Sequence, residues 1–249
     1  MTKRTLYIVL IIFLSTSTLA QLPAEQENMV GFRSEWFGGL NLHTNGWGVN
    51  LTRGKFKTYK KYNLYSFDFV HIKHPKEYKI RYQVAPGNFA RAFKYGKLNS
   101  FYNARFSYGQ QRMVFEKLRD KGVEVYFNWK TGVSLGLLKP IYLEIINIQD
   151  GISVISEEKY NPDNHNESNI YGKGAFGSGF SDMKIAPGGH IKGGFKFELA
   201  KKRENIFAIE TGLILDIFPT KIPILAYSKE EVLFYNFYIN ILFGKKYYD

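Results

Sequence analysis

The sequence predicts an all-β fold, an antiparallel up-and-down transmembrane β-barrel of eight strands, with ten strands as an alternative. Three observations predict this class. Segments such as His190–Leu199 (HIKGGFKFEL) alternate between apolar and polar side chains, and a period of two places neighbours on opposite faces of a strand. Aromatic residues make up 17% of the chain, and lipid-headgroup interfaces favour them. The connections between the strands are alternately short and long.

The first twenty residues predict a secretory signal peptide. Lys3 and Arg4 form a positive start, Leu6–Leu14 is a short apolar stretch, and Thr18–Ala20 is a small-residue cleavage site. A membrane-anchoring helix is the weaker alternative, because the apolar run is well short of the ~20 residues that a spanning helix needs. We therefore expect a signal peptide (1–20), a flexible segment (21–31) and a barrel domain (32–249).

The composition narrows the function classes. The chain has no cysteine, which excludes disulfides, thiolate metal sites and a cysteine nucleophile. Removal of Lys3 and Arg4 with the signal peptide lowers the formal net charge from +12 to +10. In an exported protein this charge predicts a partner such as anionic lipid or polysaccharide at the cell surface, and not nucleic acid.

Eight alternating segments follow along the mature chain. The predicted strands are Arg33–Leu42, Trp47–Arg53, Tyr62–Ile72, Leu98–Gln110, Val123–Ile146, His190–Leu199, Phe207–Phe218 and Val232–Phe243. The Asn-Gly turn within His43–Gly46 joins the first two in a hairpin. We interpret Val123–Ile146 as one long strand that projects beyond the membrane, although Pro140 could divide it.

The connections sort into two sets when they are counted from a periplasmic N-terminus. The expected inner turns are Gly54–Lys61, Lys117–Gly122 (with a tight turn at Leu118–Gly122) and Lys201–Asn205. The expected outer connections are His43–Gly46, Lys73–Lys97, Asn147–Pro187 and Pro219–Glu231, of which three are long. Short periplasmic turns and long outer loops are typical of bacterial outer-membrane barrels.

The polar faces of the strands are rich in Gly, Asn and Ser, with a few charges of both signs. Small residues and balanced charges suit the inside of a narrow barrel, where an unpaired charge is costly. The weaker alternative is a soluble barrel that turns its apolar face inward, but its water-facing side would be richer in Lys, Glu, Gln and Thr. We expect an interior charge network of Arg33, Glu35, Asp68, Arg105, Glu124, Lys130, Lys192, Lys196, Glu198, Glu210 and Asp216. We interpret Trp36, Trp47 and Trp129 as interfacial anchors on the lipid face.

The sequence from Arg33 onward resembles the small outer-membrane β-barrel proteins of the OmpA, OmpX and OmpW type. The resemblance rests on the signal peptide, the eight alternating strands and the aromatic last strand (FYNFYINILFGKKYYD, residues 234–249). It implies a Gram-negative source, and the Tyr-, Asn- and Lys-rich style suggests the Bacteroidota. Members of this class usually end on an aromatic residue, whereas here Phe243 closes the pattern and residues 244–249 extend past it.

Three motifs invite a chemical interpretation. Gly172–Gly177 fits G-x-G-x-x-G, but a dinucleotide site needs a preceding strand and a following helix, and a flexible loop is the better interpretation. His71 with His74, and the acidic and histidine residues of Asp163–Glu167, could each bind a metal, although neither has the spacing of a known site. We expect no metal, no cofactor and no catalytic residue.

The function that we expect is a non-enzymatic integral barrel of the cell outer membrane. It would be a surface-exposed anchor, or an accessory subunit of a secretion or assembly complex in the envelope. Its partners would be outer-membrane lipid or lipopolysaccharide and, through the two longest loops, an envelope protein. One alternative is a lipid-modifying enzyme, for which His43 and His71 lie near the outer rim. Another is a narrow, porin-like transport barrel.

Overall fold

The computed structural model describes residues 31–81, 83–85, 88–117, 122–149, 152–200 and 202–248. All of them belong to one compact unit. The predicted signal peptide and residues 21–30 lie outside the described residues and stay predictions. In the described part of the chain, no helix is long and apolar enough to cross a membrane.

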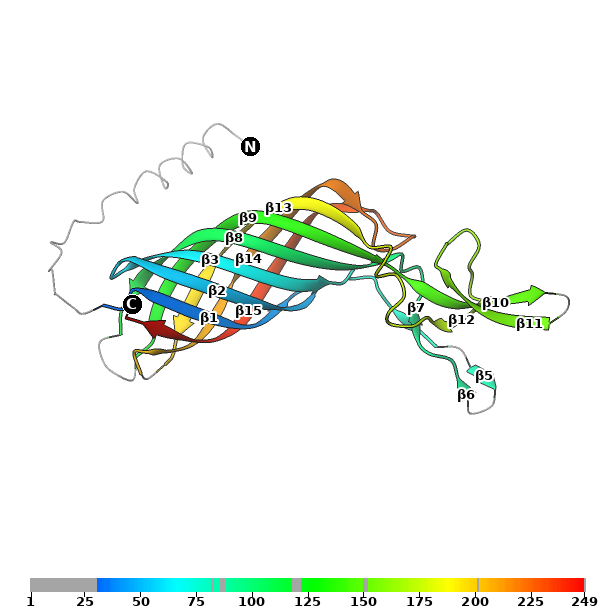
Figure 1. The fold of residues 1–249 in the computed structure, drawn as a ribbon, viewed down its shortest axis with the longest axis horizontal. Helices are drawn as coiled ribbons and strands as arrows, with labels where there is room; N and C mark the ends of the chain where they lie inside the picture. The colour runs from blue at the N-terminus through cyan, green and yellow to red at the C-terminus, as the bar shows by residue number, and fades with distance from the viewer. Residues whose placement is uncertain are drawn as a thin grey trace, which may run out of the picture. The chain divides into compact units, whose positions relative to one another are not determined.

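Eight strands form a closed antiparallel barrel, which confirms the predicted fold class and the strand number (Figure 1). The barrel strands are β1 (Ser34–His43), β2 (Gly46–Thr58), β3 (Lys61–Ile72), β8 (Asn99–Phe115), β9 (Glu124–Pro140), β13 (Lys184–Glu198), β14 (Asn205–Ile222) and β15 (Glu231–Tyr247). Each strand pairs with the barrel strand before and after it in the chain, so the topology is up-and-down.

The first and last strands close the ring. β1 pairs with β15 from Ser34 opposite Tyr247 to His43 opposite Tyr238. Closure satisfies the backbone groups that an open sheet edge would leave unpaired, which is a requirement for strands in hydrocarbon. The prediction that the last strand closes at Phe243 is wrong, because the pairing with β1 continues for four more residues, to Tyr247.

Pro140 divides the predicted fifth strand. β9 ends at Pro140, and a separate strand, β10 (Tyr142–Gln149), begins two residues later. Proline has no backbone N–H to donate, so the ladder between neighbouring strands ends there. The interpretation of Val123–Ile146 as one strand is therefore wrong, and the alternative, a division of this segment at Pro140, is confirmed.

The connections differ at the two ends of the barrel. At one end, which we call the short-turn end, the strands are joined by residues 59–60, 116–123 and 199–204. At the other, the long-loop end, they are joined by residues 44–45, 73–98, 141–183 and 223–230. This asymmetry matches the expected one. Residues 118–121 of the predicted tight turn lie outside the described residues.

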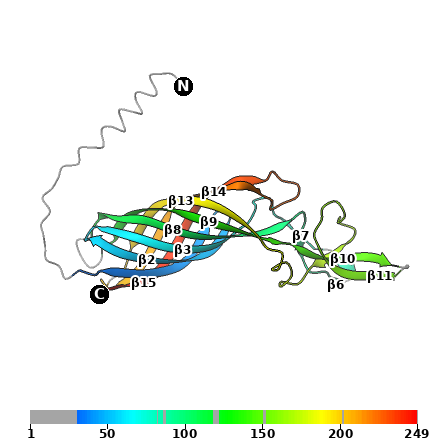
Figure 2. The same cartoon turned by 45° about the horizontal axis from the view of Figure 1, so that its top comes forward.

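The two longest connections are not plain loops. β10 pairs with β11 (Ile152–Lys159) and β12 (Ile170–Lys173) in a sheet that we call the outer-loop sheet. The other long connection contains two small pairs, β4 (Lys79–Ile80) with β7 (Phe93–Lys94) and β5 (Gln83–Ala85) with β6 (Asn88–Phe89). Both views place β10 and β11 beyond the long-loop end of the barrel (Figures 1 and 2). The expected outer connection Asn147–Pro187 thus contains strands of its own.

The outer-loop sheet has an apolar core of its own. Phe93, Leu143, Ile145, Tyr160 and Ile170 form a buried cluster there. β7 contributes Phe93 to this cluster, so the two long connections pack together as one structure. Burial of these five side chains stabilises the protruding region.

Candidate functional site

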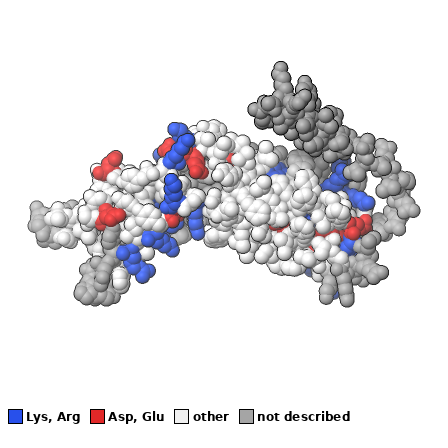
Figure 3. Space-filling view, turned by 180° about the vertical axis from the view of Figure 1, so that it is seen from behind, with Lys and Arg blue, Asp and Glu red and all other residues white. Residues whose placement is uncertain are grey.

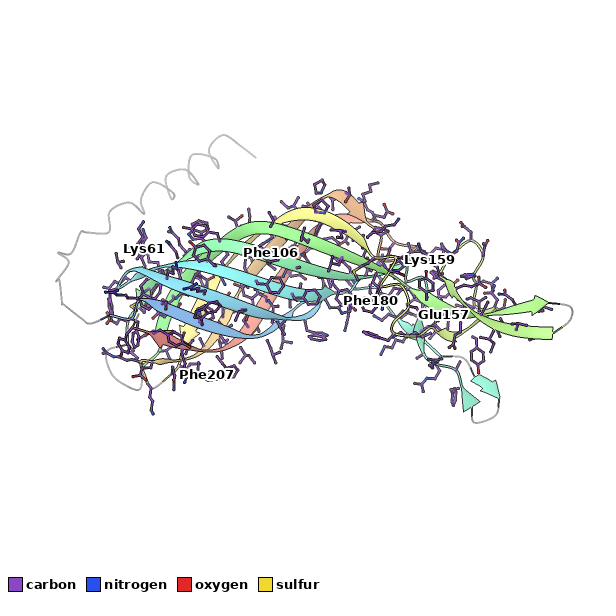
Figure 4. All side chains as sticks on the ribbon, viewed as in Figure 1. Lys61, Phe106, Glu157, Lys159, Phe180 and Phe207 are labelled. Atoms are coloured by element: carbon purple, nitrogen blue, oxygen red, sulfur yellow. The ribbon has the colours of Figure 1, made fainter. Side chains whose placement is uncertain are left out.

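The outer face of the barrel is apolar. Exposed side chains on the strands include Leu40, Leu51, Phe106, Val133, Ile191, Leu213, Phe237 and Ile239. The middle of the barrel surface is almost free of charged residues in Figure 3, and Phe106 and Phe207 stand on the outside of the wall in Figure 4. A water-soluble monomer does not expose a continuous apolar band of this kind. The polarity is that of a transmembrane β-barrel, whose lipid-facing side chains are apolar.

The three tryptophans lie on this outer face. Trp36, Trp47 and Trp129 are all exposed. Trp36 is near the short-turn end of β1, and the guanidinium of Arg53 lies 5.3 Å from its ring centroid. Trp47 is near the opposite end, where it pairs with Leu42 and His71. Tryptophan at both ends suits a membrane with two interfaces, and the anchoring role itself stays a prediction.

The barrel interior holds most of the expected charges. The nine buried ones are Glu35, Asp68, Arg105, Lys130, Lys192, Lys196, Glu198, Glu210 and Asp216. Two residues of the predicted set do not belong to it. Arg33 is exposed and precedes β1, because the strand begins one residue later than predicted. Glu124 is half-buried at the short-turn end of β9, where it accepts a hydrogen bond from Tyr126.

Lys246 is an interior cation that the sequence analysis missed. Its Nζ lies 2.5 Å from Oε1 of Glu198, and its side chain is only 7% exposed. The alternation of β15 continues through Leu242 and Gly244 to Lys246, so extending the strand to Tyr247 would have predicted it. With Lys246 in place of Arg33, the barrel interior holds five basic and five acidic side chains.

The charges near the middle of the barrel are cross-linked between strands. Nζ of Lys192 lies 3.2 Å from Oδ2 of Asp68 and 3.6 Å from Oε1 of Glu210. The same ammonium lies 4.3 Å from the ring centroid of Tyr238, whose hydroxyl donates a hydrogen bond to Glu210. Nζ of Lys130 is 3.9 Å from Oε2 of Glu210. Opposite charges at this spacing compensate the loss of hydration that each would suffer alone.

A second group lies nearer the long-loop end. Arg105 makes two hydrogen bonds to Asp216, at 2.8 Å from Nε and 2.7 Å from Nη2. Ser134 Oγ is 3.3 Å from Asp216 and 3.0 Å from Nδ1 of His190, and Ser107 Oγ is 2.7 Å from Nε2 of His190. In one consistent arrangement the Ser107 hydroxyl donates to Nε2 of a neutral His190 imidazole. Its Nδ1–H then donates to Ser134 Oγ, and the Ser134 hydroxyl donates to the Asp216 carboxylate.

This Ser–His–Asp grouping is enclosed in the protein. All four side chains are buried: Ser107, Ser134, His190 and Asp216. Arg105 already binds the Asp216 carboxylate through two hydrogen bonds. A nucleophilic serine needs room for a substrate carbonyl and for oxyanion donors. The geometry instead fits a structural network that links β8, β9, β13 and β14. His190 occupies the same alternating positions of the strand as Lys192 and Lys196, so the sequence could have predicted that its side chain points into the barrel.

Apolar side chains close the barrel interior at both ends. At the long-loop end, Phe101, Leu138, Phe218 and Phe234 belong to one buried cluster. At the short-turn end, Phe37, Leu64, Tyr126, Ile206 and Leu242 belong to another. Phe101, Leu64 and Leu242 are fully buried, which would be impossible beside an open water-filled lumen. The polar network therefore lies within a closed barrel.

Glycine makes the closure at the long-loop end tight. A Cβ at Gly188 would lie 2.6 Å from the ring of Phe218, and one at Gly136 would lie 2.8 Å from the ring of Phe101. The Phe101 and Phe218 rings meet edge to face, with centroids 5.5 Å apart. The small residues on β9 and β13 thus provide the space that these two rings fill.

The outer rim carries a buried ion pair outside the barrel strands. Nζ of Lys97 lies 2.7 Å from Oε1 of Glu77, and Lys94 contacts the other oxygen. Burial lowers the pKa of Lys97 to about 8, although Glu77 opposes that shift. Burial alone would raise the pKa of Glu77, but hydrogen bonds from the two lysines outweigh it and the net pKa is lowered. A backbone bridge from Lys97 to Leu225 ties this loop to the last outer loop.

The histidines of the motifs take part in local contacts. His74 accepts a hydrogen bond from the backbone N–H of Lys76 and contacts Ser228, whereas His71 packs on Tyr102 of the outer face. His165 contacts Glu158, with 3.4 Å between Nε2 and Oε2. Among the described residues, no group of three or more His, Cys, Asp or Glu is placed to hold a metal ion.

Two other motifs find no supporting context in the described residues. Gly172–Gly177 begins in β12 and continues into a turn, whereas a dinucleotide site would place a helix there. His43 and His71, considered for a rim enzyme, lie on different strands, and no described ion pair or hydrogen bond joins either side chain to a serine or carboxylate.

No family model and no curated protein matches the chain. Among solved structures, the crystal structure of Neisserial surface protein A (NspA) has a TM-score of 0.39 at 8% identity, covering 88% of this chain and 97% of that chain. Ail, the attachment invasion locus protein of Yersinia pestis, solved with the heparin analogue sucrose octasulfate, has a TM-score of 0.38 at 9% identity, covering 86% and 97%. At these scores neither likeness carries an argument, and the fold class rests on the chain's own strand pairing.

Proposed function

We propose that the protein is a non-enzymatic integral barrel of a Gram-negative outer membrane that holds a folded sheet at the cell surface for a protein partner. The observation that carries this proposal is a contrast between the two regions. The barrel interior is closed at both ends by apolar clusters, while the outer-loop sheet projects from one mouth with a core of its own. A closed barrel serves as an anchor, and the projecting sheet is the part available to a partner.

The asymmetric connections support the orientation. Outer-membrane barrels have short periplasmic turns and longer extracellular loops. The outer-loop sheet would therefore lie outside the cell, with the short-turn end in the periplasm.

The outer-loop sheet has features of a docking surface. β11 is an edge strand, so one side of its backbone is free to pair with another strand. Val154 and Ile155 are neighbours on β11 and point to opposite faces, yet both are exposed. The described residues therefore cover neither face of the sheet at this position, and Glu157 and Lys159 further along β11 add charges of both signs (Figure 4).

The absence of cysteine gives a clean test of the orientation. A Ser153→Cys variant in β11 should react with a membrane-impermeant maleimide on intact cells, because Ser153 is exposed on the projecting sheet. The matched Lys57→Cys variant, exposed at the short-turn end, should react only after the membrane is broken. The reverse pattern would invert the proposed orientation, and labelling of both in a soluble fraction would refute membrane insertion.

The partner is tested by photocrosslinking in living cells. A photoreactive phenylalanine analogue at Val154 should give a discrete crosslinked band, identified by mass spectrometry. The matched control is the same analogue at Phe237, an exposed position on the lipid face. The absence of a specific product from Val154 and from a second site at Ile148 would contradict the docking role.

The two alternatives make different predictions. A transport barrel would give regular single-channel steps in a planar bilayer, whereas the closed interior predicts a flat baseline. A lipid-modifying enzyme would leave altered lipid A in a deletion strain, restored by wild type but not by a His43→Ala or His71→Ala variant. We expect unaltered lipid A, because neither histidine has a described serine or carboxylate partner.

A further inference from the structure

The lipid-facing surface carries a groove of about 710 Å³ across β2, β3, β8 and β9, with Trp36 of β1 at one end. One wall is a row of cross-strand neighbours, Leu51, Phe67, Phe106 and Val133. The other wall is the next outward-facing row, Arg53, Tyr65, Tyr108 and Thr131. The residues between the rows turn their side chains into the barrel, so the floor of the groove is backbone.

The groove is shallow, open to the surroundings and elongated across the strands. It crosses three inter-strand gaps, which corresponds to about 14 Å at the usual ~4.8 Å spacing. Its walls contain aromatic pairs in tilted contact: the ring centroids of Phe67 and Phe106 are 5.0 Å apart, and those of Tyr65 and Tyr108 are 5.3 Å apart. Because these rings are already ordered by their contacts, the protein loses little conformational freedom when a chain binds.

The groove rises from the short-turn end towards the middle of the barrel. Trp36, which lines the low end, is only two residues from the start of β1 at Ser34. At the other end, Thr131 is seven residues from the start of β9 at Glu124. Barrel strands are tilted, so a row of cross-strand neighbours changes depth as it passes round the wall. A chain in the groove would run from the interface into the hydrocarbon.

The low end of the groove is basic. Arg53 and Lys55 of β2 line this end. Three further outward-facing cations lie on β2, β3 and β8, closer to the short-turn end. These three are Lys57, Lys61 and Arg112, all exposed, and Figure 4 places Lys61 at the short-turn end. None of the five cations forms an ion pair with a described residue, and no acidic side chain lines the groove.

We propose that this groove binds one anionic glycerophospholipid of the membrane leaflet at the short-turn end. Arg53 and Lys55 hold its phosphate, and one acyl chain lies between the two rows of side chains. Arginine and lysine bind phosphate oxygens through charge-assisted hydrogen bonds, and long basic side chains reach to the headgroup level from a strand in the hydrocarbon. The inference rests on the proposed membrane insertion and adds a ligand site that the anchoring role does not require.

The site is tested by native mass spectrometry of the full protein in mild detergent, titrated with phosphatidylglycerol. The Arg53→Gln/Lys55→Gln variant should bind about 30-fold more weakly than wild type, since each basic residue near an anionic headgroup contributes roughly fivefold. The matched control is Lys202→Gln/Arg203→Gln, which removes the same charge from an exposed turn at the same end. The control should bind as wild type does.

A second pair of variants tests the chain-binding part without changing charge. Val133→Trp should fill the groove and weaken lipid binding severalfold, because Val133 forms part of its wall. Leu213→Trp, at another exposed lipid-facing position on β14, should have no effect. Equal binding by all variants would refute the site, as would full displacement of the lipid by inorganic phosphate.

A heat-dependent mobility shift on SDS gels reports the folded barrel for every variant. If the shift is present and lipid binding is unaffected by the substitutions, the lipid site is refuted while the anchoring role stands. If wild type itself is water-soluble and shows no shift, the membrane role fails, and the lipid site fails with it.

Discussion

Between its two apolar end clusters the barrel buries charged side chains, whereas the outer-loop sheet buries apolar ones. The barrel encloses ion pairs such as Arg105–Asp216 and Lys192–Asp68, and it exposes leucine, phenylalanine and isoleucine. The outer-loop sheet buries Leu143 and Ile145 and places Glu157 and Lys159 at its surface. The same chain thus follows two burial rules, and the difference is the solvent that each region meets.

A single physical principle accounts for both regions. In water, apolar surface is removed from solvent, so the sheet forms an apolar core. In a bilayer, contact with hydrocarbon costs apolar side chains nothing, and the polar groups are the ones that must be enclosed and paired. The barrel interior is then specified by charge pairing and hydrogen bonding, and the sheet is specified by packing.

The largest effect is expected from breaking an interior ion pair. Asp216→Ala leaves Arg105 buried without its carboxylate, and we expect a loss of about 3–5 kcal/mol in the free energy of unfolding. Denaturant titration of the protein in liposomes, followed by the fluorescence of its three tryptophans, measures it. The double replacement Arg105→Met/Asp216→Leu should recover most of the loss. An unchanged midpoint for Asp216→Ala would mean that the pair does not stabilise the barrel.

Leu143→Ala tests the apolar core of the outer-loop sheet. We expect a loss of about 3 kcal/mol, as for other buried leucines, confined to the sheet. Limited proteolysis should cut within residues 141–183, while the barrel keeps its heat-dependent gel shift. The control is Ile148→Ala, at an exposed position of the same strand. Simultaneous loss of the gel shift would show that the sheet and the barrel do not fold as separate regions.

A matched pair of lysine substitutions compares the two solvents directly. Leu213→Lys on the lipid face should cost about 2 kcal/mol or more, because the charge enters hydrocarbon. Ile155→Lys on the outer-loop sheet should change the free energy of unfolding by less than about 0.5 kcal/mol, because that side chain already meets water. Equal costs from the same denaturant titration would contradict the membrane-facing assignment.

The smallest effect concerns pH at the outer rim. The lowered pKa of Glu77 stabilises the folded loop above the ordinary pKa of a glutamate, ~4.3, and this contribution is lost as the pH falls further. The lowered pKa of Lys97 has the opposite consequence: it disfavours the folded loop at neutral pH, and that penalty fades as the pH rises above about 8.

Hydrogen exchange of residues 88–98, corrected for intrinsic rates, should therefore show lower protection at pH 3 than at pH 7. The Glu77→Gln variant should lose this pH dependence, while exchange in the barrel strands stays slow at both values. Protection that is independent of pH in wild type would show that the Glu77–Lys97 pair does not hold the loop.

Much of the barrel was predictable because strand alternation is local. The parity that puts Asp68, Lys192 and Glu210 on one face can be counted along the chain, and the placement of Trp47 on the other face follows in the same way. The errors occurred where alternation ends or changes partner. Alternation continues through Pro140 in the sequence, and only the pairing of β10 with β11 shows that a new sheet starts there.

The sequence by itself predicted eight strands, with ten as an alternative, together with the face on which most strand side chains lie and the asymmetry of the connections, because all three depend on neighbours along the chain. Tertiary structure decided which charges meet, such as Lys246 with Glu198, and that His190 contacts serines on two other strands. It also decided that the interior is closed and that a basic groove crosses four strands. Those features depend on the register and closure of the barrel, which bring together residues far apart in the chain.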